Sequence, residues 1–377
     1  MKQVRSRENV AATRRHLRKK KKKAAGVDGM SRDEFLRNFP VEIKKIQEAL
    51  AEGYHPDDLR KAVIPQLGPG DRSRGIKILT ASDSCVQRLL NGPMHREVDP
   101  MLSSSCCAYR PGRQQLDAVR SFQAIASQYG YVLQADVSDF FNSIPLHRVM
   151  MMLTGLVEPK LATLIYTFMR LGSHWDNNSG WVGLPQGTPL APILSNLYMT
   201  NFDWFWMRKG AVSLRYCDDI LVFTRSYKQA VSAYDLVEKT LRKQGLSLHP
   251  KKTKPVASHD AVFLGYGLTR DFDLRIAKSS VERFKWRTME RLEKYRTTRP
   301  SDPIKKELAA LRGWSNYFYL STTSRPVGYL DQWHRRTWIR FVEETKGLSP
   351  DNLPSLAEVF TKVQDRRGVG CSSPSSR

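Results

Sequence analysis

The chain has 377 residues, of which 41% are hydrophobic and 10% aromatic, so it can fill two or three domain cores and is not disordered throughout. Its formal net charge of +24 implies a polyanionic partner, with nucleic acid favoured over an anionic membrane. It has no apolar run near the roughly 18 residues of a membrane-spanning helix, no signal-peptide pattern and no cysteine pair at zinc-binding spacing. We therefore expect a soluble, cytoplasmic protein with reduced thiols and no membrane partner.

The N-terminal region carries a dense basic block within residues 14–23. Because its like charges repel and it offers little apolar surface, we expect residues 1–25 to be a basic arm that does not fold alone. Such an arm either grips phosphates or is simply solvated. Residues 26–60 are predicted to be N-terminal extension helices, the first capped by Ser31 with Glu34 in the capping-box position.

A glycine-rich segment separates two short apolar runs, at residues 63–65 and 76–79. This pattern predicts two strands joined by a loop that bears Arg72 and Arg74. Basic side chains on such a tip can close over a triphosphate, and a merely solvated tip fits the same residues.

Asp136 stands where a predicted buried strand, residues 131–137, comes to its end. Beyond it, residues 138–142 turn towards a helix that Pro145 helps to begin. The carboxylate is therefore either a helix cap or turn acid, or one member of a larger site.

Proline and glycine dominate residues 183–192, which follow two predicted helices between residues 146 and 171. These residues cannot begin as a helix, but residues 191–207 are predicted to form a long one. Gln186 lies in the rigid segment before it, where a side chain can be held in one geometry.

The chain is organised around residues 214–223, where two adjacent acids interrupt an apolar, β-branched run. We expect a strand, a tight turn and a second strand, with Asp218 and Asp219 at the bend. Acids are ordinary residues of turns. However, Mg²⁺ binds a few carboxylates together with substrate phosphates, and these two acids with Asp136 would suit it.

The remaining chain completes an α+β pattern. Residues 227–244 are predicted to be a helix, residues 246–254 an edge strand tipped with lysines at residues 251–254, and residues 262–266 another strand, which together imply an antiparallel sheet. Residues 276–345 are predicted to be helical, with an apolar face. The rest of their surface is basic, which suits binding to a nucleic-acid duplex. Their aromatic residues are interpreted as core. We expect residues 346–377 to be a C-terminal tail.

Taken in order, several of these segments resemble the motif set of reverse transcriptases. The matching motifs are Ala135–Asp136, Leu184–Pro192, Tyr216–Asp219, Leu246–Thr253 and Phe263–Tyr266.

Within that family, the chain is most similar to the bacterial group II intron type, from about Gly26 to Val342. Gly26–Met30 resembles the lineage's N-terminal extension, Tyr109–Arg113 its Phe-Arg-Pro-Gly-Arg motif, and Leu311–Tyr317 its maturase thumb. The chain departs from the lineage at Cys217, where alanine is usual, and at Lys77, where proline is usual. It also shows no Cys/His-rich endonuclease after the thumb.

The resemblance implies a right-hand polymerase, with fingers and an antiparallel-sheet palm over residues 61–275 and an all-helical thumb over residues 276–345. It implies an RNA-directed DNA polymerase that extends a DNA or RNA primer with dNTPs on an RNA template. Two Mg²⁺ ions, with Mn²⁺ as a substitute, would support the reaction. The resemblance assigns them four ligands: Asp136, Asp218, Asp219 and the carbonyl of Val137.

The resemblance also implies five nucleotide-binding side chains. Phe141 would exclude a 2′-hydroxyl, and Gln186 would contact the incoming nucleotide or the template. Lys252 would lie beside the leaving pyrophosphate, although Lys251 could take that place. The triphosphate clamps would be Arg72 and Arg74.

The biological role stays open between several readings. One is a group II intron protein that also binds a structured intron or other non-coding RNA for splicing. Another is a domesticated relative in antiviral defence, CRISPR spacer acquisition or DNA repair. A non-catalytic splicing cofactor and an RNA-templated RNA polymerase are the alternatives of other classes; the intact acids argue against the first and Phe141 against the second.

Overall fold

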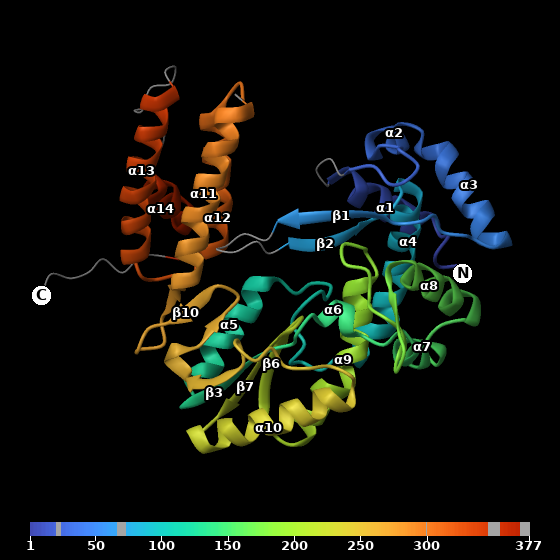
Figure 1. Cartoon of the computed structure of the whole chain (residues 1–377), viewed down its shortest axis with the longest axis horizontal. Helices are drawn as coiled ribbons and strands as arrows, with labels where there is room; N and C mark the ends of the chain where they lie inside the picture. Colours follow the sequence, from blue (N-terminus) through green and yellow to red (C-terminus); the bar gives the residue numbers. More distant parts are fainter. Residues whose placement is uncertain (20–23, 66–72, 299, 346–354, 370–377) are drawn as a thin grey trace, which may run out of the picture. The chain divides into compact units, whose positions relative to one another are not determined.

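The computed structural model describes residues 1–19, 24–65, 73–298, 300–345 and 355–369. These residues divide into two compact units. The first unit holds Met1–Pro65, Ser73–Gln115 and Leu133–Pro255, and the second holds Leu116–Val132 and the chain from Val256 onward. Figure 1 labels most of their helices and strands.

The N-terminal residues are not a free arm, which corrects the expectation for residues 1–25. Helix α1 (Arg7–Lys19) packs on helix α4 (Ala81–Val98). Leu17 of α1 is 2% exposed, and the Asn9 side-chain amide donates a hydrogen bond to the Leu89 carbonyl at 2.7 Å. The helix forms because an apolar side on an otherwise basic segment finds a partner in α4. Residues 20–23 of the basic block lie outside the described residues.

The predicted extension helices are present. Ser31 caps α2 (Arg32–Arg37) by accepting a hydrogen bond from the Glu34 amide at 3.2 Å. Helix α3 (Phe39–Glu52) follows and buries Phe39, Ile46 and Leu50. The predicted hairpin is also present, as antiparallel strands β1 (Arg60–Pro65) and β2 (Ser73–Ile78). Its tip, residues 66–72, lies outside the described residues.

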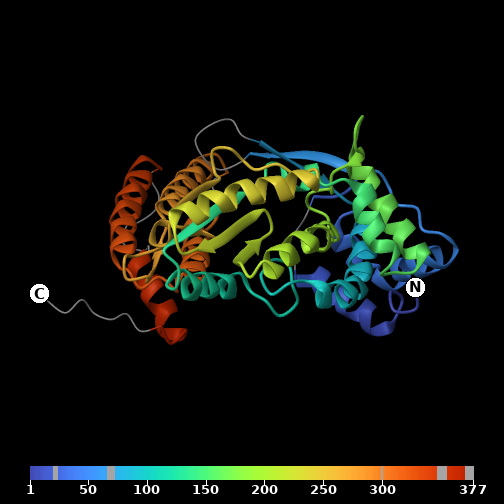
Figure 2. The ribbon, with the colours of Figure 1, turned by 90° about the horizontal axis from the view of Figure 1, so that it is seen from below.

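A four-stranded sheet forms the centre of the acid-bearing region, in the order β6-β7-β3-β8. Its strands are β3 (Tyr131–Asp136), β6 (Val212–Tyr216), β7 (Asp219–Thr224) and β8 (Lys254–Ala257). Helix α10 (Tyr227–Lys243) packs on β7, and Figures 1 and 2 both show it running along the sheet. This arrangement confirms the α+β prediction and its antiparallel sheet.

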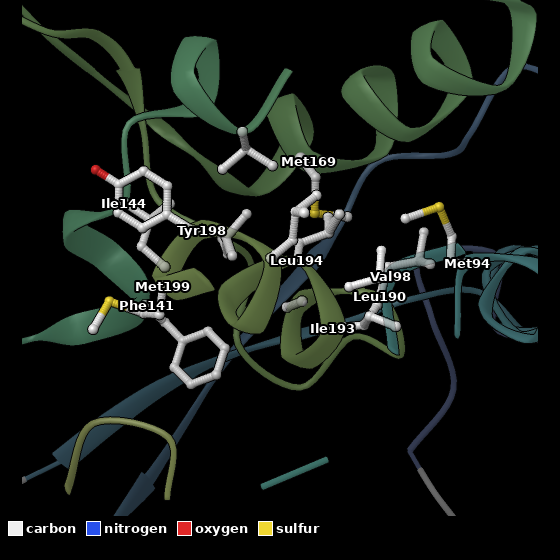
Figure 3. Packing of buried hydrophobic residues seen from close by; sticks show 14 of the residues in the cluster. Met94, Val98, Phe141, Ile144, Met169, Leu190, Ile193, Leu194, Tyr198 and Met199 are labelled. Atoms are coloured by element: carbon white, nitrogen blue, oxygen red, sulfur yellow. The ribbon is translucent and has the colours of Figure 1, made fainter. Parts of the chain in front are cut away.

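Helix α9 (Ala191–Arg208) is the core helix of the first unit and packs against α4, α7 (Leu146–Thr154) and β6. It is buried around most of its circumference, as expected of a helix enclosed by other elements. Figure 3 shows Leu194 and Met199 of α9 in the same packed cluster as residues of α4 and α8 (Pro159–Gly172).

A short β-hairpin lies in the chain between α8 and residue 183. Residues 174–182 form a small hairpin of strands β4 (His174–Asp176) and β5 (Gly180–Val182). Val182 bridges to Pro145, which follows the short helix α6 (Phe140–Ser143).

A buried ion pair joins α9 to the sheet. The Arg215 guanidinium of β6 is 1% exposed and donates two hydrogen bonds to the Asp203 carboxylate of α9, at 2.8 and 2.6 Å. It also donates to the Asn196 side-chain carbonyl at 3.3 Å. Because both charges are removed from water, the loss of either partner would leave an unpaired charge in the core and lower the stability of the fold.

The second unit contains more than the predicted helices. It includes α5 (Gln115–Ala126) and a three-stranded sheet in the order β11-β10-β9. These strands are β9 (Val262–Phe263), β10 (Tyr266–Leu268) and β11 (Leu274–Ile276), so part of the segment predicted as palm groups with the helices.

Four more helices of this unit lie at the warm-coloured end of the described chain in Figure 1. They are α11 (Lys278–Thr298), α12 (Pro303–Phe318), α13 (Arg325–Thr345) and α14 (Leu356–Arg366). Helix α14 packs on α12 and α13 and buries Leu356 and Phe360, so the prediction of a tail from residue 346 is wrong for this segment. None of the described helices has both the length and the apolar character needed to cross a bilayer.

We expect Asp203→Ala to destabilise the protein by about 3–5 kcal/mol, because it leaves the buried Arg215 charge without its partner. Chemical denaturation monitored by circular dichroism measures the loss. Glu238→Ala is the matched control, because it breaks the exposed Arg242 pair on α10 and should cost about 0.5 kcal/mol or less. Equal, small losses in both variants would contradict the role given to the buried pair.

Candidate active site

The two adjacent acids lie at the turn between β6 and β7. Tyr216 pairs with Asp219, which leaves Cys217 and Asp218 as a two-residue loop. Cys217 adopts φ +64°, in the left-handed region that favours glycine. A non-glycine residue held there costs on the order of 1–3 kcal/mol, a strain typical of functional turns.

The acid strand β3 is hydrogen bonded directly to this turn. The Val137 amide donates to the Asp218 carbonyl at 3.1 Å. On the other side, the His249 amide donates to the Asp136 carbonyl at 2.7 Å, and the Asp136 amide donates to the Thr253 hydroxyl at 3.3 Å. Three segments that are distant in sequence therefore meet at one end of the sheet and bring the predicted aspartates together.

The electrostatics of the carboxylates reflect this proximity. Burial, and then repulsion from Asp218 and Asp136, raises the pKa of Asp219 to about 8. Burial is also the largest cause that raises the pKa of Asp218, and repulsion from Asp136 adds to it. The site therefore concentrates negative charge that a cation would stabilise.

The donors fit a divalent cation of the Mg²⁺ type. Among the described residues, nothing donates a hydrogen bond to the Val137 carbonyl, so this predicted ligand is available. No group of three His, Cys, Asp or Glu side chains in the described parts of the chain is already arranged around a metal position. Mg²⁺ does not require such a cage, because it takes one or two carboxylates with waters and substrate phosphates.

Of the two candidate lysines, Lys252 is the one that contacts the acids. Its ammonium lies 3.1 Å from both carboxylate oxygens of Asp136. The Lys252 side chain is 54% exposed, so the contact is solvated and easily exchanged. Lys251 is exposed beside it, and its amide donates to His249 Nδ1 at 3.3 Å.

Backbone hydrogen bonds hold the segments that carry Phe141 and Gln186. The Leu184 amide donates to the Phe141 carbonyl at 2.7 Å, and the Lys77 amide of β2 donates to the Gln186 carbonyl at 3.0 Å. Gly187 has φ +96°, and a Cβ there would come within 3.2 Å of the Lys77 carbonyl oxygen, so this close approach requires glycine. The hairpin and the Gln186 segment are thus positioned together with Phe141.

Phe141 itself is 9% exposed, at the edge of the packed cluster in Figure 3. Of the predicted clamps, Arg72 lies outside the described residues. Arg74 is placed by its backbone in β2, opposite Ile64.

The structure adds supporting residues that the sequence analysis did not identify. Arg215 donates a hydrogen bond to the Cys217 carbonyl at 3.1 Å and so supports the strained turn from behind. Tyr109 is hydrogen bonded to the Cys217 thiol, whose pKa burial raises to about 12. The available signal for Arg215 was a charged residue within an apolar strand, between Leu214 and Tyr216.

Comparison with protein families identifies one match. The family model described as "Reverse transcriptase (RNA-dependent DNA polymerase)" matches residues 67–268, more than half of the chain. The matched region contains all of the predicted site residues.

Individual relatives are distant and cover the chain in part. Protein YkfC of Escherichia coli strain K12 is 26% identical over 65% of this chain and 76% of its own length. The group II intron-encoded protein LtrA of Lactococcus lactis is 26% identical over 43% of this chain but only 28% of its own length. The retron Ec86 reverse transcriptase of Escherichia coli is 28% identical over 50% of this chain and 56% of its own length. Among solved structures, telomerase from Candida albicans aligns with a TM-score of 0.46 and 11% identity, over 88% of this chain and 66% of that chain.

Proposed function

The chain belongs to the reverse transcriptase family, and we propose that the acids at the end of the β6-β7-β3-β8 sheet are its catalytic centre. It is an RNA-directed DNA polymerase of the group II-like type. Polymerases of this family depend on divalent metal ions. The attacking group is the 3′-hydroxyl of a primer, the template is an RNA and the substrates are dNTPs.

One observation carries the assignment of the centre. The Val137 amide and the Asp218 carbonyl are hydrogen bonded at 3.1 Å, which holds the end of the acid strand against the acid turn. An acid at either position alone would be an ordinary turn residue. Their juxtaposition, with burial and then repulsion raising the pKa of Asp218 and Asp219, supports a cation site.

We assign the binding of two Mg²⁺ ions to Asp136, Asp218 and the Val137 carbonyl, with Asp219 supporting them from the strand behind. When bound, divalent cations neutralise charge on the attacking and leaving oxygens of an in-line phosphoryl transfer. Lys252, which is solvated and mobile on its stem, is able to turn from Asp136 towards a leaving pyrophosphate.

The sugar and base of the incoming nucleotide would meet Phe141 and Gln186. Because the Phe141 backbone is fixed by the Leu184 amide, its ring offers a steady surface that excludes a 2′-hydroxyl. Gln186 is fixed in the same way through the Lys77 amide. Arg74 on β2, with Arg72 beyond the described part of the hairpin, would clamp the triphosphate.

We expect Asp218→Asn to lower primer extension on a primed RNA template by on the order of 10³-fold or more, because it removes a metal-binding charge. The melting temperature should stay at or above that of the parent, since the change also removes repulsion from Asp136 and Asp219. Asp235→Asn, at an exposed position on α10, is the control for charge and should keep full activity. Full activity of Asp218→Asn would exclude Asp218 from the centre, because primer extension would then take place without this carboxylate.

We expect Phe141→Ala to raise rNTP incorporation relative to dNTP incorporation by about tenfold or more, because the ring no longer fills the space of a 2′-hydroxyl. Single-nucleotide extension with dNTPs and rNTPs supplied in turn measures this ratio. Phe140→Ala is the matched control, because Phe140 is a buried neighbour 5.5 Å away whose loss weakens packing without opening the sugar site. An unchanged ratio in an active, folded Phe141→Ala protein would refute the gate.

A further inference from the structure

A pocket in the first unit lies apart from the acids of the proposed catalytic centre. It has a volume of about 190 Å³ and is bordered by α1, α2, β2 and the N-terminal end of α4. Its walls are mainly apolar and include Leu17, Phe35 and Leu79, which belong to the packed core of this unit. Among the described residues, no acidic side chain lines it. The pocket therefore offers an apolar interior without a negative charge.

The segment that closes one side of the pocket is held tightly against the start of α4. A Cβ at Gly26 would lie 2.6 Å from the Thr80 Cα, so this approach of two backbones requires glycine. Thr80 in turn caps α4, because its hydroxyl accepts a hydrogen bond from the Asp83 amide at 3.1 Å. The pocket thus has a fixed wall at this end.

Two arginines make one end of the pocket positive. Arg32 of α2 lines the pocket and is only 9% exposed; burial lowers its pKa, and Asp33 offsets part of that effect. Arg88 lies on the same stripe of α4 as Ala81 and Ser84, which also line the pocket. Burial, and then repulsion from Arg32, lowers the pKa of Arg88. The two guanidinium groups therefore lie close enough to repel each other beside the pocket.

Arg88 lacks the partners that a half-buried guanidinium normally has. Its Nε is buried without a hydrogen-bond partner in the part of the chain that the structure describes. None of the described groups that act on its charge is a carboxylate. A buried donor without an acceptor lowers stability, and so does repulsion between two cations. An anion between Arg32 and Arg88 would relieve both effects.

We propose that this pocket binds a small apolar carboxylate, with the carboxylate between Arg32 and Arg88 and the apolar part against Leu17 and Phe35. Guanidinium groups match a carboxylate through paired hydrogen bonds. The apolar walls favour the burial of a hydrocarbon or aromatic group. The volume lies below the range of sites for drug-sized ligands, which favours a compact molecule over a nucleotide. Binding here needs none of the three aspartates, so it stands or falls separately from the proposed catalytic centre.

Isothermal titration calorimetry of the full chain with 3-phenylpropionate tests this proposal. We expect binding that is about tenfold weaker in Arg88→Gln, because the carboxylate loses one of its two charged partners. Ser84→Leu, which fills the pocket without changing charge, should weaken binding similarly. Circular dichroism checks that both variants fold. Unchanged affinity in either folded variant would overturn the proposal.

Arg96→Gln is the matched control, because Arg96 is exposed on the same helix and does not line the pocket. It should leave the affinity unchanged. Acetate has the charge without the apolar part, and 3-phenylpropanol has the apolar part without the charge, so each should bind about tenfold more weakly or less. The proposal is also overturned if 3-phenylpropionate does not bind, if either of these probes binds as tightly, or if Arg96→Gln lowers the affinity as much as Arg88→Gln.

Discussion

The hydrogen bond from the Val137 amide to the Asp218 carbonyl is the constraint on which the candidate site depends. It joins the end of β3 to the β6–β7 turn, and the pairing of residues 247–249 with the other side of the acid strand completes the arrangement. Because these are backbone contacts, they fix the Cα positions from which the carboxylate side chains extend, whatever rotamers those side chains adopt. A catalytic constellation built in this way is preorganised by the sheet itself rather than by mobile loops.

The same region contains several interactions that cost stability. Cys217 is held at a left-handed φ, and burial, together with repulsion from the neighbouring aspartates, raises the pKa of Asp218 and Asp219. These costs are offset by the buried Arg215, which binds Asp203 on α9 and the Cys217 carbonyl in the turn. An arginine buried for packing alone would be replaced to advantage by an apolar residue. Its place behind the acid turn explains why a charge is kept there, since strain at functional sites must be supported by the surroundings.

Much of this arrangement could be predicted from local sequence pattern. The acid strand, the Asp218 hairpin, the rigid Gln186 segment and the long helix after it each have a clear periodicity or turn signal, and each is present. The α1 and α14 helices were missed for one reason. Their sequences are strongly basic or polar, and their apolar sides gain stability only from tertiary partners, α4 for the first and α12 with α13 for the second.

Other features depend on distances that no sequence pattern contains. The contact between Lys252 and Asp136 depends on which side of the segment faces the acid, and the support of the turn by Arg215 requires α9 to lie behind it.

The central claim is that Asp136 and the Asp218–Asp219 turn share one divalent-cation site, and iron-mediated cleavage tests it most directly. Fe²⁺ bound in place of the natural cation, with ascorbate and peroxide, generates hydroxyl radicals that cut the backbone near its ligands. The account predicts cuts close to both Asp136 and Asp218 in the folded chain, with both suppressed by excess Mg²⁺. Cleavage at only one of the two segments, or cuts that Mg²⁺ does not suppress, would contradict it.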